Sequence, residues 1–226
     1  MTRAAARPSP AGVVAPAAVA PPAAVAALAR ADPRLGRVIA RVGSAAGADA
    51  RRDYPRDHFA ALVRAVLGQQ VSVAAAAAMY ARLLAHHGGR APGPAEVLAA
   101  DPETLRGAAG LSRAKLATLR ALAAEVAGGR LDLDRLPERS DDDVQAALVA
   151  IRGIGPWTAQ VFLMLHLERP DVVCPGDLGI RRAIRHAYEL DALPDAAQVI
   201  TLAQAWRPHR TLACRFLWAS VAAGLV

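Results

Sequence analysis

The sequence predicts an all-α protein that folds as two helical lobes with a cleft between them. From residue 32 onward, apolar residues recur at the three- and four-residue spacing of a buried helix face. The two-residue alternation typical of a half-buried strand is absent from the sequence. Capping residues and glycines divide the chain into roughly ten helices. The 226 residues are enough for one sizeable domain or for two small lobes.

The chain opens with an Ala/Pro/Val-rich tract over residues 1–28, which contains five prolines. These prolines interrupt the apolar run and argue against a signal peptide. We therefore expect a disordered tail over residues 1–28 and a helical domain over residues 29–226. Outside the tract, no apolar stretch free of charges reaches the roughly 18 residues of a membrane span, so none is expected.

The first clear helix is predicted around residues 59–67. Apolar residues there fall at positions i, i+3, i+4, i+7 and i+8, which builds one apolar face. A second helix is expected to begin after Ser72, whose side chain can cap the free amides, and to stop at Gly88 and Gly89. The residues of the apolar face are Phe59, Leu62, Val63, Val66 and Leu67.

Two more serines predict helix starts further along the chain. Ser112 is expected to cap a helix with apolar residues on its inner side, and Ser140 to cap the next one. Residues 141–143 are three aspartates, which could suggest a metal site. We favour a structural role, because acids suit the positive end of a helix dipole. The last helices are expected over about residues 195–205 and 208–223.

A helix-hairpin-helix motif is the most informative local pattern. Gly153, Ile154 and Gly155 permit a tight reversal with positive φ, and Pro156 suits the first turn of the following helix. Backbone amides at such a turn can bind a phosphate group without any side chain. The alternative is a compact turn between two packed helices.

The charge balance favours a polyanionic partner. The chain has 27 basic and 20 acidic residues, a net charge of +7 at neutral pH, and Lys115 is its only lysine. Cys174 and Cys214 are too few for a zinc site or a four-cysteine iron–sulfur cluster, and two free thiols fit a reducing compartment.

Three ordered blocks carry a resemblance to a known family. They are Leu148, Ile151, Gly153 to Gly155, Trp157 to Ala159, Pro175 and Asp177; Arg64 to Ser72; and Trp206 to Arg210. This pattern resembles the helix-hairpin-helix/Gly-Pro-Asp base-excision DNA glycosylases, and is most similar to bacterial 3-methyladenine-DNA glycosylase II in a short, all-helical form. The resemblance covers residues 55 to 220, approximately. The N-terminal β-domain of larger family members is missing from the pattern.

The resemblance implies that Asp177 is the catalytic acid. A glycosylase flips a nucleotide out of the duplex and stabilises the positive charge that develops on its sugar, which requires a nearby carboxylate. Asp177 is also placed to cap the following helix, and the two roles are compatible. Asp171 is the rival acid, but no motif supports it.

The position of a lysine separates two kinds of family member. Relatives that also cut the backbone have a lysine two residues after the second hairpin glycine, where it forms a Schiff base. Trp157 occupies that position here, and Lys115 is far away along the sequence. A monofunctional enzyme is therefore expected.

The resemblance also assigns DNA contacts. Gln70 is expected to wedge into the stack vacated by the flipped base, and Trp157, Trp206 and His209 to form the base pocket. A histidine stacks less well than the aromatic residue of some relatives, and Trp206 could also belong to the core. The DNA backbone is expected to meet four hairpin residues, which are Gly153, Ile154, Gly155 and Thr158.

No cofactor is expected to be required, and no iron–sulfur cluster. By resemblance, the hairpin could bind a structural Na⁺ or K⁺ through the backbone carbonyls of Val149, Ile151 and Ile154.

The sequence thus predicts a monofunctional DNA N-glycosylase that excises alkylated purines, 3-methyladenine and 7-methylguanine, in base-excision repair. The expected partner is double-stranded DNA with damaged bases, bound by a monomer in the cytoplasm at the nucleoid. Two alternatives stay open: a glycosylase for other lesions or mismatches, and a non-catalytic helix-hairpin-helix DNA-binding protein.

Overall fold

The computed structural model describes residues 21–43 and 54–226, and all regular elements within these two ranges are helical. The all-α fold class is therefore confirmed. The α-helices are α1 (Pro22–Ala31), α2 (Pro33–Val42), α4 (His58–Gly68), α5 (Val73–His86), α6 (Pro94–Ala99), α7 (Pro102–Ala109), α8 (Arg113–Ala127), α9 (Asp141–Val149), α10 (Pro156–Leu165), α11 (Leu178–Tyr188), α12 (Ala196–Leu202) and α13 (Arg210–Ala222). Two short 3₁₀ helices, η1 (Leu136–Glu138) and η2 (Ala203–Trp206), complete the set.

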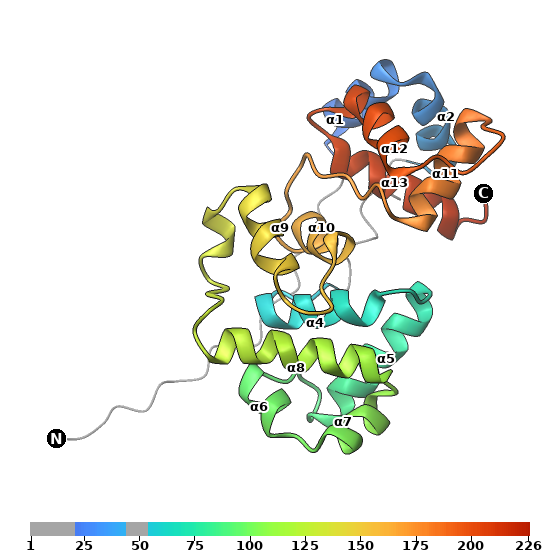
Figure 1. Cartoon of the computed structure of the whole chain (residues 1–226). Coiled ribbons are helices and arrows are strands. Elements are labelled where there is room, and N and C mark those ends of the chain that lie inside the picture. The colour runs from blue at the N-terminus through green and yellow to red at the C-terminus, as the bar shows by residue number, and fades with distance from the viewer. Residues whose placement is uncertain (1–20, 44–53) are drawn as a thin grey trace.

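The helices form two lobes, as Figure 1 shows. One lobe contains α4 to α10, and the other combines α1 and α2 with α11 to α13. Helix α2 packs against both α11 and α13, so the first helices complete the lobe that the last helices build. The chain crosses between the lobes in the segment from α10 to α11, which carries Asp177.

The expected tail over residues 1–28 is wrong in its boundary. Helix α1 begins at Pro22, and its Leu28 is only 1% exposed in the hydrophobic core. Proline is compatible with the first position of a helix, and no proline follows within α1, so the composition of the tract hid a helix start. Residues 1–20 of the expected tail lie outside the described residues.

Asp32 joins the first helices to the last ones. It caps α2 by accepting from the backbone N–H groups of Arg34 and Leu35, each at 3.0 Å. Its Oδ2 also accepts from the indole N–H of Trp206 at 2.8 Å and from the hydroxyl of Tyr188. Burial raises the pKa of Asp32, but these hydrogen bonds outweigh burial and hold the pKa below its usual value.

Helices α4 and α10 form an antiparallel pair at the centre of the first lobe. His58, at the start of α4, lies against His166, just past the end of α10, with 2.6 Å between Nδ1 and Nε2. At the other end of the pair, Gly68 of α4 lies beside Trp157 of α10. The sequence predicted one apolar face on α4, but more of the helix is buried than that face. Helices α5, α8 and α10 pack around α4 and bury eight of its residues.

The predicted serine caps are confirmed. The hydroxyls of Ser72, Ser112 and Ser140 accept from the amide three residues on, at 3.1 to 3.2 Å. The aspartates after Ser140 fill the first turn of α9, and Asp141 pairs with Arg169 at 3.2 Å. Within the described ranges, no cluster of potential metal ligands is found there, and no helix is long and apolar enough to cross a membrane.

Candidate active site

An open cleft of about 880 Å³ lies where the ends of α4, α10 and α11 meet. It brings together three segments that are far apart in the sequence: residues 68–72, the hairpin residues 153–158, and the start of α11 with Arg182. The predicted cleft between the lobes, with the hairpin at its mouth, thus appears in the structure. Residues 68–72 belong to the sequence block Arg64 to Ser72, and the hairpin and Asp177 belong to the block that begins at Leu148.

The hairpin turn depends on Gly153. Its φ is +88°, and a Cβ atom built there would lie 2.0 Å from the side-chain oxygen of Thr118 on α8, so only glycine fits. Gly155 differs from the expectation of positive φ. Its φ is −101°, and it serves as the N-cap residue of α10.

The four hairpin residues that are predicted to contact the DNA backbone separate into two groups. Gly153 and Gly155 line the cleft, and among the described residues their amide N–H groups donate to no protein acceptor. These amides are therefore free for an anion. The side chain of Ile154 is buried, and the buried Thr158 hydroxyl accepts from Gln69 Nε2 at 2.9 Å. Thr158 thus braces the hairpin through its side chain.

Asp177 lies in the cleft wall with its carboxylate held by three donors from three helices. Its Oδ1 accepts from the backbone N–H of Ile180 at 2.8 Å and from the indole N–H of Trp218 at 3.0 Å. Its Oδ2 accepts from the indole N–H of Trp157 at 2.7 Å. The predicted helix cap is confirmed, and the carboxylate is fixed in orientation beside open space.

Trp218 is a site residue that sequence reasoning missed. It lies on α13, 41 residues after Asp177, and belongs to none of the three sequence blocks. No local signal in the sequence distinguishes an indole that packs in the core from one that donates to a carboxylate. Only the packing of α13 against α11 makes that contact.

Trp157 spans the cleft. Its indole N–H reaches Asp177, while the far edge of its six-membered ring lies 3.5 Å from where a Cβ atom on Gly68 would be. The half-buried ring therefore links the end of α4 to the start of α11. Trp157 lines the cleft, and its role in a base pocket stays a prediction.

Gln70 lies at the cleft with an exposed side chain and a φ of +54°, in the left-handed region that few residues other than glycine adopt. Its neighbour Gln69 has a different role. Gln69 Nε2 donates to the carbonyl of Gly153 at 3.0 Å and to Thr158, which ties the loop after α4 to the hairpin.

Two predicted pocket residues lie elsewhere. Trp206 is fully buried and donates to Asp32, so its assignment to the base pocket is wrong and it belongs to the core. His209 precedes α13 and does not line the cleft. The rival acid Asp171 accepts from Arg207 at 2.9 Å and from Arg210 at 2.8 Å. Its carboxylate therefore belongs to an ion-pair cluster.

Lys115 is far from the hairpin only along the sequence. Its ammonium group is buried at the end of α4, where it donates to the carbonyls of Val66 at 3.0 Å and Gln69 at 2.7 Å. Burial lowers the pKa of Lys115. Both of these contacts engage the amine, so it is not free to act as a nucleophile.

The thiols lie in the core near Asp177. Cys174 and Cys214 are fully buried, and burial raises the pKa of Cys214 to about 12 and that of Cys174 well above its usual value. Such thiols are unreactive. Cys174 donates to the sulfur of Met164 at 3.3 Å, which is a packing contact.

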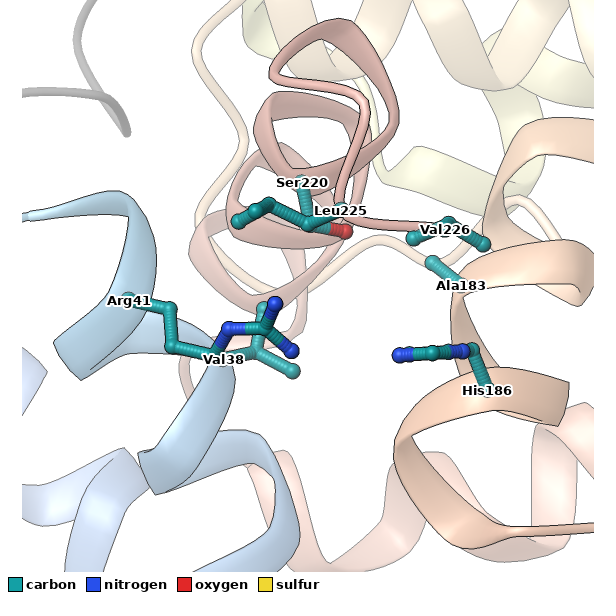
Figure 2. A pocket seen from close by; sticks show the side chains of 7 residues that line it. All are labelled: Val38, Arg41, Ala183, His186, Ser220, Leu225 and Val226. Carbon is teal, nitrogen blue, oxygen red and sulfur yellow. The ribbon is translucent and has the colours of Figure 1, made fainter.

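A second hollow lies within the other lobe and has a volume of only about 20 Å³. Arg41 of α2 and His186 of α11 line it from opposite sides, as Figure 2 shows. That volume suits a single water molecule and not a nucleobase. The larger cleft is therefore the candidate active site.

Comparison with known proteins identifies the family of the chain. Residues 63–208 match the model of the HhH-GPD superfamily of base excision DNA repair proteins. The chain belongs to this superfamily. The matched range contains Gln69, the hairpin and Asp177, but it ends before Trp218.

Individual relatives cover different shares of the chain. DNA-3-methyladenine glycosylase 1 of Schizosaccharomyces pombe is 32% identical over 165 residues, which span 72% of each chain. A putative DNA-3-methyladenine glycosylase of Bacillus subtilis is 38% identical over 96 residues, and the match spans 42% of this chain and 33% of that relative.

Solved structures are similar over more of the chain. The S. pombe 3-methyladenine DNA glycosylase in complex with abasic DNA superposes with a TM-score of 0.78 and 27% identity, over 88% of this chain and 97% of that one. A DNA-3-methyladenine glycosidase from Bacillus halodurans gives 0.67 and 31% identity, over 89% and 90% of the two chains. The two-lobed fold of this HhH-GPD protein is thus shared with both.

Proposed function

We propose that this HhH-GPD protein is a DNA N-glycosylase that extrudes an alkylated purine from double-stranded DNA and hydrolyses its N-glycosyl bond. The observation that carries the proposal is the carboxylate of Asp177, which faces an open cleft and is fixed by three N–H donors. Relatives named DNA-3-methyladenine glycosylase support the same activity.

The chemistry follows from this fixed anion. As the base leaves, the electron pair of the C1′–N bond moves to the base and positive charge develops on the sugar, which a carboxylate stabilises. Asp177 Oδ2 accepts from Trp157 alone among the described residues and keeps lone pairs for a water molecule. The water oxygen then bonds to C1′ and its proton passes to the carboxylate or to solvent.

The substrate class is argued from the lining of the cleft. A purine methylated at N3 or N7 carries a positive charge, so it departs as a neutral base without a general acid. Trp157 is the one aromatic residue lining the cleft in the described part of the chain. Its hydrogen bond to Asp177 lies in the ring plane and does not use the π faces, which attract a cationic ring by ~0.5–2 kcal/mol.

Hydrolysis without strand cleavage is part of the proposal. Strand cleavage in this superfamily needs an amine that forms a Schiff base, and Trp157 occupies the position of that lysine. The hydrogen bonds of Lys115 to two carbonyls support the same conclusion, since they engage its amine.

The expected alkali ion remains a proposal. Its donors would be the carbonyl oxygens of Val149, Ile151 and Ile154, and hard oxygen atoms of this kind suit Na⁺ or K⁺. The Ile151 carbonyl accepts from the N–H of Ile154 at 3.0 Å, and its second lone pair can still face an ion. A bound ion would order the hairpin. No other cofactor is proposed.

The proposed partner is double-stranded DNA with damaged bases, bound by a monomer in the cytoplasm at the nucleoid. The net charge of +7 supports a polyanionic partner. The S. pombe glycosylase that shares the fold was solved with abasic DNA, which also supports this partner.

Base release from three duplexes tests the proposal: methylated, uracil-containing and undamaged. Wild-type protein should release 3-methyladenine, 7-methylguanine more slowly, and little uracil. Asp177→Asn should lose at least about 100-fold in release with duplex binding retained, because the change is nearly isosteric and removes the charge. Asp101→Asn is a matched control, since both aspartates cap a helix through Oδ1 and asparagine caps equally well.

The outcomes separate the alternatives. Faster release of uracil would favour a glycosylase for other lesions. DNA binding without release of any base would favour a non-catalytic module. Trp157→Ala should lower release of the methylated bases more than it lowers binding to undamaged duplex.

A further inference from the structure

The only lysine of the chain lies beneath the loop that is expected to enter the DNA stack. Lys115 is 8% exposed, and its ammonium group donates to the carbonyls of Val66 and Gln69 at the C-terminal end of α4. Carbonyls at a helix end lack the N–H partner of a following turn, although the Val66 carbonyl also accepts from the Gln69 N–H at 3.2 Å, and a cation there is favoured by the helix dipole. A buried charge is costly unless it is hydrogen-bonded, so these contacts account for its position.

Gln69 is held from two sides. The ammonium group of Lys115 donates to the carbonyl of Gln69 at 2.7 Å. The side chain of Gln69 donates to the Gly153 carbonyl and to the Thr158 hydroxyl. The first contact connects the loop to α8, and the second connects it to the hairpin. The next residue, Gln70, has the left-handed backbone with φ of +54°.

Packing does little to hold this loop. The wedge loop, residues 68–72, and the start of α5 expose two large apolar side chains, Val71 at 40% and Val73 at 82%. A left-handed backbone at a residue other than glycine persists only where its surroundings fix it. Among the described residues, the polar contacts of Gln69 are the ones that join the wedge loop to both neighbours.

We propose that Lys115 and Gln69 are positioning residues that fix the wedge loop to the hairpin. This inference rests on the proposed glycosylase function. A wedge displaces a base only if it stays in place relative to the phosphates that the protein grips. With Gln69 tied to both elements, the free hairpin amides and Gln70 act at a fixed separation, and the loop is ordered before DNA binds.

Lys115→Met removes the ammonium group and keeps an apolar stem of similar length. Other buried residues of α8, Leu119 and Leu122 among them, anchor the helix, so the fold should survive. Lys115→Arg keeps donors at the same place, so this variant should retain most of the wild-type release rate. Arg130→Met is the charge-matched control, because Arg130 follows α8 and pairs with Glu125 on the surface.

The test compares one lesion in two settings. A 7-methylguanine is placed opposite cytosine in a duplex, or in an unpaired bulge where extrusion is already done. Lys115→Met should lower the single-turnover release rate at least about tenfold on the paired lesion and less than about threefold on the bulged one. Fluorescence of a 2-aminopurine beside the lesion, which reports unstacking, should fall in parallel on the paired duplex. Affinity for undamaged duplex should stay within about twofold.

Equal losses on both substrates, or no loss on either, would overturn the proposal. If Lys115→Met does not fold, Gln69→Met tests the same link from the surface with the same predicted pattern. Where both variants fold, their combined effect should be less than the sum, because both act through one loop. Failure of the proposed function looks different, since wild-type protein would then release no base from either substrate.

Discussion

Trp218, near the end of the last helix, donates its indole N–H to Oδ1 of Asp177 at 3.0 Å and ties α13 to the N-terminus of α11. The carboxylate therefore depends on a residue outside the range that matches the superfamily model. Of the other two donors, Trp157 belongs to the helix that follows the hairpin turn, and Ile180 donates through its backbone N–H, which a substitution does not remove. Trp218 is therefore the donor side chain that can be replaced with the least disturbance of the hairpin.

Trp218→Phe should lower the base-release rate about tenfold with little change in the Kd for duplex DNA, because it removes a donor that orients Asp177 and leaves the apolar packing. Single-turnover kinetics and duplex titration measure the two quantities. Trp206→Phe is the matched control. It removes the hydrogen bond to Asp32, so it should lower Tm and leave the release rate of the folded protein unchanged. A release rate unaffected by Trp218→Phe would contradict the positioning role.

Gly153→Ala should destabilise the protein by about 1–3 kcal/mol and weaken DNA binding. The new Cβ atom would collide with Thr118, and a φ of +88° is strained for alanine. Urea denaturation measures the free energy of unfolding. Gly155→Ala is the control for stability, since its φ is −101° and no atom lies within 4 Å of its added Cβ. Equal stability of the two variants would show that the turn adapts to a side chain.

Duplex affinity should fall steeply with salt, because phosphate contacts release bound counterions. Arg182 lines the cleft and is exposed, so Arg182→Gln should reduce the slope of log Kobs against log salt by about 1. Arg106→Gln, which removes a guanidinium paired with Glu103 on α7, should leave the slope unchanged. Titration by fluorescence anisotropy over a salt series measures the slopes. A flat response of the wild type would point to a different partner.

The protein should lose stability as the pH falls below about 6.5, partly through His166. Burial lowers the pKa of His166, although its hydrogen bond to the Pro55 carbonyl opposes the effect. The unfolded chain therefore takes up a proton at a pH where the folded chain does not, and stability decreases until the lowered pKa is reached. His166→Gln should flatten this dependence in urea denaturation between about pH 7.5 and 5.5. His86→Gln, at the exposed end of α5, controls for the loss of one histidine.

Borohydride should trap no covalent adduct between the wild-type chain and damaged DNA. Trapping needs a free amine at C1′, and the ammonium group of Lys115 is held by Val66 and Gln69. Trp157→Lys places an amine at the position that lyases use, and it serves as a positive control for the reaction conditions. Efficient trapping of the wild-type protein would contradict the assignment of hydrolysis alone.

The features that the sequence predicted correctly depend on residues only a few positions apart in the chain. Helix starts at Ser72, Ser112 and Ser140 follow from one capping side chain and the amides of the next turn. The hairpin and the cap at Asp177 are equally local. The boundary at residue 28 failed because composition hid the start of α1, where Pro22 is compatible with helix.

By itself, the sequence determined the helical fold class, the hairpin and the helix cap at Asp177, since each depends on neighbours within a few residues. Tertiary structure decided which residues meet. Trp206 ends η2 and Trp218 lies on α13, yet one donates to Asp32 in the core and the other to Asp177 in the cleft. Lys115 reaches Gln69 across 46 positions. Such contacts depend on how whole helices pack, and packing is set by the sum of many apolar contacts that no single motif records.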